Sequence, residues 1–366
     1  MGRCGICRIS SAFISAEVGA CGRCLREHPE EALPLALQAH SRSRAAFGLP
    51  PSPPEDPQGA RCSLCMHRCR IPPGGKGYCG LRRNDGRRLK GGKSSEGKLF
   101  WYHDQLPTNC VGEFVCPGGT GSGYPRYAHL PGPERGYRNL AVFFQACNFN
   151  CLYCQNWQFR MSTLKPGVES PSSLASAVDE RTSCICYFGG DPTPQAPFAL
   201  RVSRLAMKRG EGILRICWET NGSMASGLLK KMLDLSLISG GCIKFDLKAW
   251  DEGLHRALTG VSNARTLENF ASAAQAAEER RDPQLTIAST LIVPGYIDEK
   301  EVRSIARFVA SIDPETPYSL LGFHPCFYMQ DLPLTPASLA RRCLEAAKDE
   351  GLKRVHIGNI HLLSPG

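Results

Sequence analysis

The sequence predicts an α/β protein built on a partial (β/α)6 parallel barrel with an N-terminal cysteine-rich metal-binding extension. From residue 138 onward, six short apolar runs alternate with amphipathic segments. Upstream, cysteines gather in two blocks on either side of a proline-rich stretch at 49–59. Strands that alternate with helices imply a parallel sheet. Six repeats instead of eight suggest an incomplete barrel, with its site at the carboxyl ends of the strands.

The apolar runs are the expected strands, and the amphipathic segments between them are the expected helices. Strands are predicted at 139–147, 183–190, 213–222, 242–250, 285–295 and 318–325, with 354–359 as a seventh candidate. Helices are predicted at 172–180, 195–209, 224–235, 264–280, 298–311 and 335–349, and a short one at 31–47. Ser172, Asp298 and Thr335 stand where helix N-caps belong.

Four segments follow from these patterns. Residues 1–48 are a cysteine-rich knuckle with a short helix, and 49–59 form a proline-rich linker. Residues 60–137 combine a basic cysteine-rich module with a loop rich in glycine and proline, and 138–366 make the barrel. We expect the loop at 116–136 to lie ordered against the barrel.

The composition excludes a membrane protein and indicates bound metal. No apolar run is long enough to span a bilayer. Cys4 and Cys7 stand where a signal peptide would have its apolar core, so we expect a cytoplasmic protein. In a long cytoplasmic chain, closely spaced cysteines bind metal more often than they form disulfides. The 19 cysteines are therefore candidate metal ligands before they are candidate disulfides.

Positive charge is concentrated beside these cysteines. The chain carries a net charge of +10, and residues 60–100 contain 11 Lys and Arg against Asp85 and Glu96. Such a segment could dock an acidic partner or nucleic acid. It could equally be a solvated face that offsets the charge of thiolate clusters. No aromatic stacking pattern accompanies the charge, which favours the second interpretation.

Three cysteines, Cys147, Cys151 and Cys154, follow the first predicted barrel strand with the spacing Cys-x3-Cys-x2-Cys. Tetrahedral zinc and a complete four-iron cluster would each use four ligands. Three thiolates on a four-iron cluster leave one iron free to bind an outside chelate. The alternatives are a zinc site or a cluster that a distant residue completes.

The stretch CNFNCLYC resembles the signature of the radical S-adenosylmethionine (radical SAM) superfamily, with Tyr153 as the aromatic residue before the last cysteine. The resemblance implies that S-adenosylmethionine chelates the open iron of a [4Fe-4S] cluster. Electron transfer from the cluster then yields a 5′-deoxyadenosyl radical. The cofactor carries the hard chemistry, while the barrel holds it and excludes water.

Later strand ends extend the resemblance, in particular to the activases of glycyl-radical enzymes. GGDP looks like the family's segment that meets the cofactor's amino group, and ETNG, DLK and VPG resemble other strand ends of the activases. The resemblance implies these cofactor-binding residues: Tyr153, Gly189, Gly190, Asp191, Pro192, Glu219, Asn221, Asp246, Lys248, Val293 and His324.

A closer resemblance, over about residues 60–360, is to the AmmeMemoRadiSam-type radical enzymes. CSLCMHRCRIPPGGKGYC is similar to the N-terminal module of that branch. The first 30 residues and WYHDQLPTNC resemble additions of an archaeal subset. Archaeal relatives of this architecture include cobalamin-dependent peptide C-methylases, such as those that modify methyl-coenzyme M reductase.

The remaining cysteines form further candidate sites. Cys4, Cys7, Cys21 and Cys24 have knuckle spacing, for which zinc is the first choice and an iron–sulfur cluster the second. Cys62, Cys65, Cys69 and Cys79 could hold zinc or an auxiliary cluster. Cys110 and Cys116 could complete a site or line the cleft, and Cys184, Cys186, Cys217 and Cys242 read as buried small hydrophobes. Cys326 and Tyr328 are weak catalytic candidates, as a radical quencher or a cobalt ligand.

The substrate does not follow from the cofactor. Our first expectation is modification of a protein or peptide residue, with cobalamin-dependent C-methylation of glutamine in methyl-coenzyme M reductase as the best guess. No Asp-x-His-x-x-Gly cobalamin motif supports it. Glycyl-radical activation is the alternative, and RNA modification a further one. In each case we expect an external electron donor of the flavodoxin or ferredoxin type.

Overall fold

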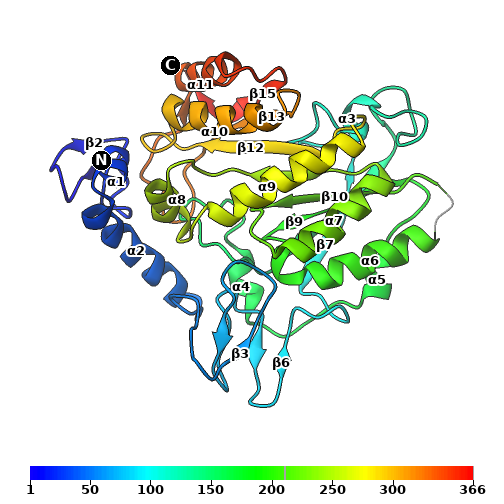
Figure 1. Ribbon diagram of the computed structural model, residues 1–366, viewed down its shortest axis with the longest axis horizontal. Coiled ribbons are helices and arrows are strands. Elements are labelled where there is room, and N and C mark those ends of the chain that lie inside the picture. The colour runs from blue at the N-terminus through cyan, green and yellow to red at the C-terminus, as the bar shows by residue number, and fades with distance from the viewer. Residues whose placement is uncertain (210–211, 366) are drawn as a thin grey trace.

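A computed structural model describes residues 1–209 and 212–365. Its centre is a curved eight-stranded sheet in the order β15-β13-β12-β11-β10-β9-β8-β7 (Figure 1). Neighbouring strands from β8 to β15 run parallel, and β7 pairs antiparallel with β8 at one edge. Six strand–helix crossovers connect the seven parallel strands. The α/β prediction of a parallel, partial barrel is confirmed.

The six predicted strands and the seventh candidate all lie in this sheet. The strand that sequence analysis missed is β7, which extends the sheet beyond β8. The bounds are β7 Leu99–Gln105, β8 Arg138–Phe144, β9 Thr182–Gly189, β10 Arg215–Thr220, β11 Ile243–Asp246, β12 Thr286–Ile292, β13 Tyr318–Gly322 and β15 Val355–Gly358.

Helices between the strands cover the outer face of the sheet (Figure 1). They are α5 Pro171–Ala175, α6 Ala196–Arg209, α7 Ser226–Ser239, α8 Glu252–Thr259, α9 Ala264–Ala276, α10 Glu299–Ile312 and α11 Ala337–Asp349, with the short α4 Phe159–Thr163 after the cysteine triad. Asp298 caps α10 as predicted, because its carboxylate accepts from the amides of Lys300 and Glu301. The other two cap predictions are wrong. Ser170 caps α5 in place of Ser172, and α11 begins after Pro336.

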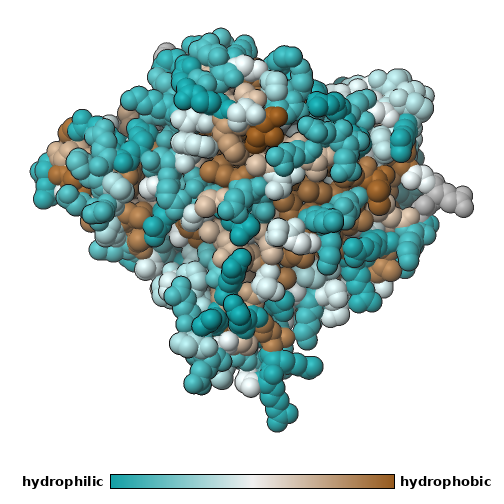
Figure 2. All heavy atoms as spheres, viewed as in Figure 1, coloured by the Kyte–Doolittle hydropathy of each residue, from teal (hydrophilic) through white to brown (hydrophobic). Residues whose placement is uncertain are grey.

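The N-terminal segments pack against the barrel. Helices α1 (Gly22–Glu27) and α2 (Pro29–Ala45) lie along α8. The helix expected at 31–47 is α2, which has the same length of 17 residues and begins two residues earlier. Two small hairpins follow and project from the lower end of the molecule, where many hydrophilic side chains face outward (Figures 1 and 2). They pair β3 (Ala60–Arg61) with β4 (Arg70–Ile71), and β5 (Arg83–Asn84) with β6 (Leu89–Lys90).

The short remaining elements are β1 Gly2–Arg3, β2 Ser10–Ser11, α3 Pro117–Thr120, β14 Thr335–Pro336 and β16 Leu363–Ser364. Helix α3 is a single turn in the glycine-rich loop after β7. Within the described residues, no helix combines the length and apolarity that crossing a bilayer requires.

Side chains alternate between the two faces of each strand, and this alternation separates core from site. On β9 and β10, Tyr187 and Trp218 are fully buried and stack on each other with ring centroids 4.7 Å apart. The intervening residues, Cys186, Cys217 and Glu219, line a cavity on the inner face of the sheet. The same alternation therefore places cysteines and charges inside the barrel.

Candidate functional site

The three cysteines of the signature lie on the loop after β8. Hydrogen bonds to α8 and to α2 hold this loop in place. The amides of Asn150 and Leu152 donate to the carbonyls of Thr259 and Leu258, at 2.9 and 3.0 Å, at the end of α8. The Asn150 side chain donates to Ser43 on α2 at 2.7 Å. The N-terminal helix therefore fixes the backbone next to Cys151.

The glycine pair at the end of β9 leaves room beside the triad. Gly189 has a φ of 99°, which a residue with a side chain rarely adopts. A Cβ on Gly190 would lie 2.3 Å from the carbonyl oxygen of Ala146. Only glycine fits at position 190 without moving the backbone that leads into Cys147. The close approach forms a cradle beside the first cysteine.

Asp191 joins two strand ends. Its carboxylate accepts from the amide of Asn221 at 2.7 Å, from the amide of Thr193 at 2.8 Å and from the Thr220 hydroxyl at 3.1 Å. Burial raises the pKa of Asp191, and these hydrogen bonds oppose that rise. Asn221 in turn directs its side-chain nitrogen toward the sulfur of Cys147, 3.9 Å away. Asp191 thus positions a polar side chain at the cluster loop.

A charged pair faces the triad from β11. Lys248 contacts Asp246 at 2.9 Å, and its ammonium lies 6.0 Å from the centre of the Tyr153 ring. Burial disfavours the ammonium, but the negative charges around it, of which the Asp246 carboxylate is the largest, together raise the pKa of Lys248 above its ordinary value. The Tyr153 hydroxyl is buried with no hydrogen-bond partner. The site therefore offers both signs of charge and an unused hydroxyl.

These groups share one cavity of about 170 Å³. Ten of the expected ligands and cofactor-binding residues line it: Cys147, Cys151, Cys154, Tyr153, Gly189, Gly190, Asp191, Asn221, Asp246 and Lys248. Four others do not line it: Pro192, Glu219, Val293 and His324. Sequence analysis missed further lining residues, which are Phe149, Gln155, Asn156, Arg160, Leu291 and Leu321. Strand alternation from Ser289 and Ser319 could have identified the two leucines.

Glu219 belongs to a second cavity, of about 130 Å³, deeper in the barrel. Its carboxylate contacts Lys244 at 2.8 Å, and Lys244 also donates to the sulfurs of Cys110 and Cys186 at 2.9 and 3.3 Å. Cys217 faces the same cavity. Because Glu219 and Lys244 each precede a lining residue of the first cavity by two positions, the second cavity lies one layer below it.

Further cysteines of the chain line this second cavity. They are Cys110, Cys116, Cys184, Cys186, Cys217 and Cys242. Cys184, Cys186, Cys217 and Cys242 are buried, as the sequence suggested, although Cys242 lies just before β11 and not within it. Cys110 and Cys116 reach the cavity from the loop after β7. A buried lysine among these thiols is the feature that the sequence did not reveal.

The two weak catalytic candidates lie beside the triad. The Cys326 thiol is 3.5 Å from the carbonyl oxygen of Cys154, and the amide of Tyr328 donates to Leu152 at 2.9 Å. Between them, Phe327 has a left-handed backbone with a φ of 55° and stacks on Trp157. The segment after β13 therefore covers the cluster loop from the outside.

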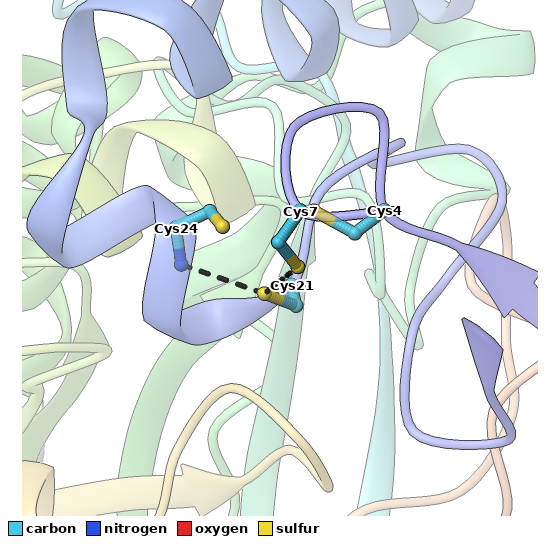
Figure 3. A group of neighbouring side chains, drawn as sticks. All are labelled: Cys4, Cys7, Cys21 and Cys24. Atoms are coloured by element: carbon cyan, nitrogen blue, oxygen red, sulfur yellow. Dashed lines mark hydrogen bonds between the residues drawn. The ribbon is translucent and has the colours of Figure 1, made fainter. Parts of the chain in front are cut away.

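The N-terminal cysteines form a compact group at the start of α1. The ligand atoms of Cys4, Cys7, Cys21 and Cys24 all lie within 4.8 Å of one another, and the sulfurs of Cys7 and Cys21 are 3.8 Å apart (Figure 3). Zinc–thiolate bonds of about 2.3 Å in a tetrahedron require sulfurs about 3.8 Å apart. The group fits a single tetrahedral ion.

Comparison with known proteins agrees with this geometry. The family model described as the radical SAM superfamily matches residues 141–309, which include the triad and the strand ends around it. Residues 141–309 are a radical SAM domain. Members of this superfamily bind a [4Fe-4S] cluster and S-adenosylmethionine, and the triad and its cradle fit both groups. The chain is thus a radical SAM enzyme.

Some relatives match most of this chain, and others match less than half of it. An uncharacterized protein of Methanocaldococcus jannaschii is 27% identical over 315 residues, which cover 83% of each chain. The isethionate sulfite-lyase activating enzyme of Oleidesulfovibrio alaskensis is 33% identical over 142 residues. That match covers 38% of this chain and only 41% of the relative. A solved domain of a pyruvate-formate lyase-activating enzyme from Bacteroides vulgatus is 19% identical, with a TM-score of 0.39, and covers 48% of this chain and 98% of that domain.

Proposed function

We propose that this radical SAM enzyme abstracts a hydrogen atom from a residue of a protein or peptide. The observation that carries the proposal is the single cavity that joins the cysteine triad to the Gly190 cradle and to Asn221, Asp246 and Lys248. When bound, the cluster and S-adenosylmethionine supply a 5′-deoxyadenosyl radical. Activating enzymes of glycyl-radical proteins among the relatives support a polypeptide substrate.

The chain's own residues hold and shield the cofactor. Lys248 and Asn221 supply donors suited to a carboxylate, and the Asp246 carboxylate is suited to ribose hydroxyls. The backbone at Gly190 can approach a ligand closely because no side chain intervenes. Leu291 and Leu321 present apolar surface on the opposite wall. Closure of such a cavity strengthens its polar contacts by excluding water.

The second cavity suits the substrate. It lies on the same strands one layer below the cofactor residues, and its polar layer is the Lys244–Glu219 pair. Burial alone would lower the pKa of Lys244, but the neighbouring Cys110 and Glu219 charges raise it. A fixed pair of opposite charges can orient an amide or another dipolar group. We therefore place the reacting side chain or backbone segment here.

Glycyl-radical activation is the version that the relatives favour. The test is anaerobic reduction with S-adenosylmethionine and a candidate partner protein. A glycyl signal in electron paramagnetic resonance, together with 5′-deoxyadenosine, supports activation. The Cys151→Ala variant is the negative control. Absence of 5′-deoxyadenosine from reconstituted wild-type enzyme would refute the proposed function as a whole.

Cobalamin-dependent C-methylation of a peptidyl residue is the second candidate, and glutamine in methyl-coenzyme M reductase is the example to try first. The observation that favours it is Cys326, a thiol held next to Cys154 where a cobalt ligand or hydrogen donor could act. Protein produced with cobalamin should then carry the corrinoid absorbance, and a peptide substrate should gain one methylene by mass. Protein without bound corrinoid removes this candidate.

RNA modification is the third version, and the basic segment at 60–100 is its only support. It requires RNA binding that weakens with salt and weakens again when Arg82, Arg83, Arg87 and Arg88 are neutralised. A filter-binding assay at low salt decides the point, since absence of any binding there eliminates RNA as a substrate.

A further inference from the structure

Arg160 is a buried cation beside the cysteine triad. It lies on α4, shortly after Cys154, and its side chain is part of the wall of the triad's cavity. The residue is 3% exposed, and its Nη1 atom is buried without a hydrogen-bond partner. Its Nη2 atom donates to the Asn150 side chain at 3.4 Å. Within residues 1–209 and 212–365, no carboxylate lies within 4.0 Å of the guanidinium nitrogens of Arg160.

Two other buried cations of the barrel have a carboxylate partner. Arg215 contacts Glu134 at 2.5 Å, and Lys244 contacts Glu219 at 2.8 Å. A buried charge is tolerated when a partner of opposite charge and hydrogen bonds compensate for the lost water, and an isolated one is strongly unfavourable. Arg160 therefore departs from the way in which this chain compensates these two cations.

Aromatic rings compensate the Arg160 charge only in part. The Cζ atom of Arg160 lies 4.6 Å from the ring centre of Phe159 and 4.7 Å from that of Phe327. Such cation–π contacts are favourable, but they are weaker than the loss of hydration of a buried guanidinium. The charge balance of the site therefore calls for an anionic ligand close to Arg160.

The cysteine triad is the source of negative charge to which Arg160 is tied. Asn150, which accepts from Arg160, directly precedes Cys151 in the chain, and α4 follows the last cysteine of the triad. The second cysteine set lines a separate small cavity, and Arg160 is not among the residues that line it: Cys62, Cys65, Cys69 and Cys79. An iron–sulfur cluster held by three thiolates is anionic, so it supplies the charge that the Arg160 site requires.

We propose that Arg160 is the counter-charge of the iron–sulfur cluster at the triad and raises the reduction potential of that cluster. Reduction by an external one-electron donor adds a negative charge, and a fixed cation nearby stabilises the reduced form more than the oxidised form. Arg160 is thus a positioning residue for charge, distinct from Lys248 and Asn221 at the strand ends. The inference goes beyond the proposed function, since it rests on the cluster and not on the substrate.

The test is an anaerobic reductive titration of the reconstituted full chain, followed by electron paramagnetic resonance without S-adenosylmethionine. At the wild-type midpoint potential, Arg160→Met should have a ratio of reduced to oxidised cluster about tenfold lower, which is about 59 mV for a one-electron couple. Arg160→Lys keeps the charge and should stay within about threefold of the wild-type ratio. The matched control is Arg204→Met on the exposed face of α6, which removes a screened charge and should leave the ratio unchanged.

Two results would overturn the proposal. One is an unchanged potential in Arg160→Met, and weaker binding of S-adenosylmethionine in that case would assign Arg160 to the carboxylate of the cofactor. The other is an equal shift in Arg160→Lys, because the charge would then not be the cause. If Arg160→Met fails to fold, Arg160→Gln replaces it, since it removes the charge and keeps a donor for Asn150. No substrate enters these measurements, so failure here is separate from failure of the proposed function.

Discussion

Replacing Asp191 by asparagine tests whether this carboxylate organises the cofactor end of the sheet. One of its oxygens accepts from the amide of Thr193 and the other from the amide of Asn221, at 2.8 and 2.7 Å. In either orientation, the asparagine NH2 group would face one of these N–H groups. The variant loses a charge-assisted hydrogen bond and buries two opposed donors, at a cost of about 2–4 kcal/mol.

The assay is thermal unfolding of the reconstituted protein. With an unfolding entropy of roughly 2 cal/mol/K per residue, this cost lowers the melting temperature of a chain of this length by about 3–5 °C. The matched control is Asp234→Asn on the exposed face of α7, which should change stability by less than about 0.5 kcal/mol. If Asp191→Asn melts within about 1 °C of the control, the carboxylate does not have the structural role inferred here.

Three further substitutions test other parts of the structure. Gly190→Ala should strain the backbone by about 1–3 kcal/mol and weaken binding of S-adenosylmethionine, measured by calorimetry, because its Cβ would lie 2.3 Å from an oxygen of Ala146. Gly227→Ala, with open space around it, is the control and should bind normally. Arg215→Met should cost about 3–5 kcal/mol in urea unfolding because it leaves Glu134 charged and buried, and Arg215→Met/Glu134→Leu should cost less. An equal loss in the single and double variants would contradict this.

The last prediction in this group concerns pH. Burial lowers the pKa of His255 from 6.5 to about 4, so its neutral form stabilises the fold above pH 6.5 and that stability is lost as the pH falls toward 4. The expected contribution is about 2 kcal/mol between pH 7 and pH 5. Urea unfolding at the two pH values should show a smaller difference in His255→Gln, and an unchanged difference would be evidence against the shift.

The barrel was predictable because its signals are local. Each strand combines an apolar run with a polar strand end, and the triad lies directly after the first of them. Strand β7 was not predictable in this way, since its Phe100, Trp101 and Tyr102 are exposed at an edge and show no clear alternation. Helix α8 was missed because a strand run and a helix follow each other within a few residues at 242–259.

The site was predictable where strand ends converge and not where the chain closes over them. Asn221, Asp246 and Lys248 fall at the carboxyl ends of neighbouring strands, so topology alone brings them together. Glu219 was assigned to the cofactor on resemblance, but it is one layer too deep and turns toward Lys244. That pairing depends on the register of β10 against β11, which sequence periodicity does not specify.

The compact cysteine group near the N-terminus has a consequence for how the whole chain responds to metal supply. Its loop is tied to the barrel, because Tyr296 accepts from the amide of Ser15 at 2.9 Å and donates to Ala20 at 3.0 Å. Gly22 packs so closely on Gly295 that a Cβ there would lie 2.6 Å from the Gly295 oxygen. An ion that binds only the folded state stabilises everything coupled to that state. A metal ion bound at these four cysteines would therefore act as a thermodynamic effector of the barrel, through its binding free energy, at a distance from the cysteine triad.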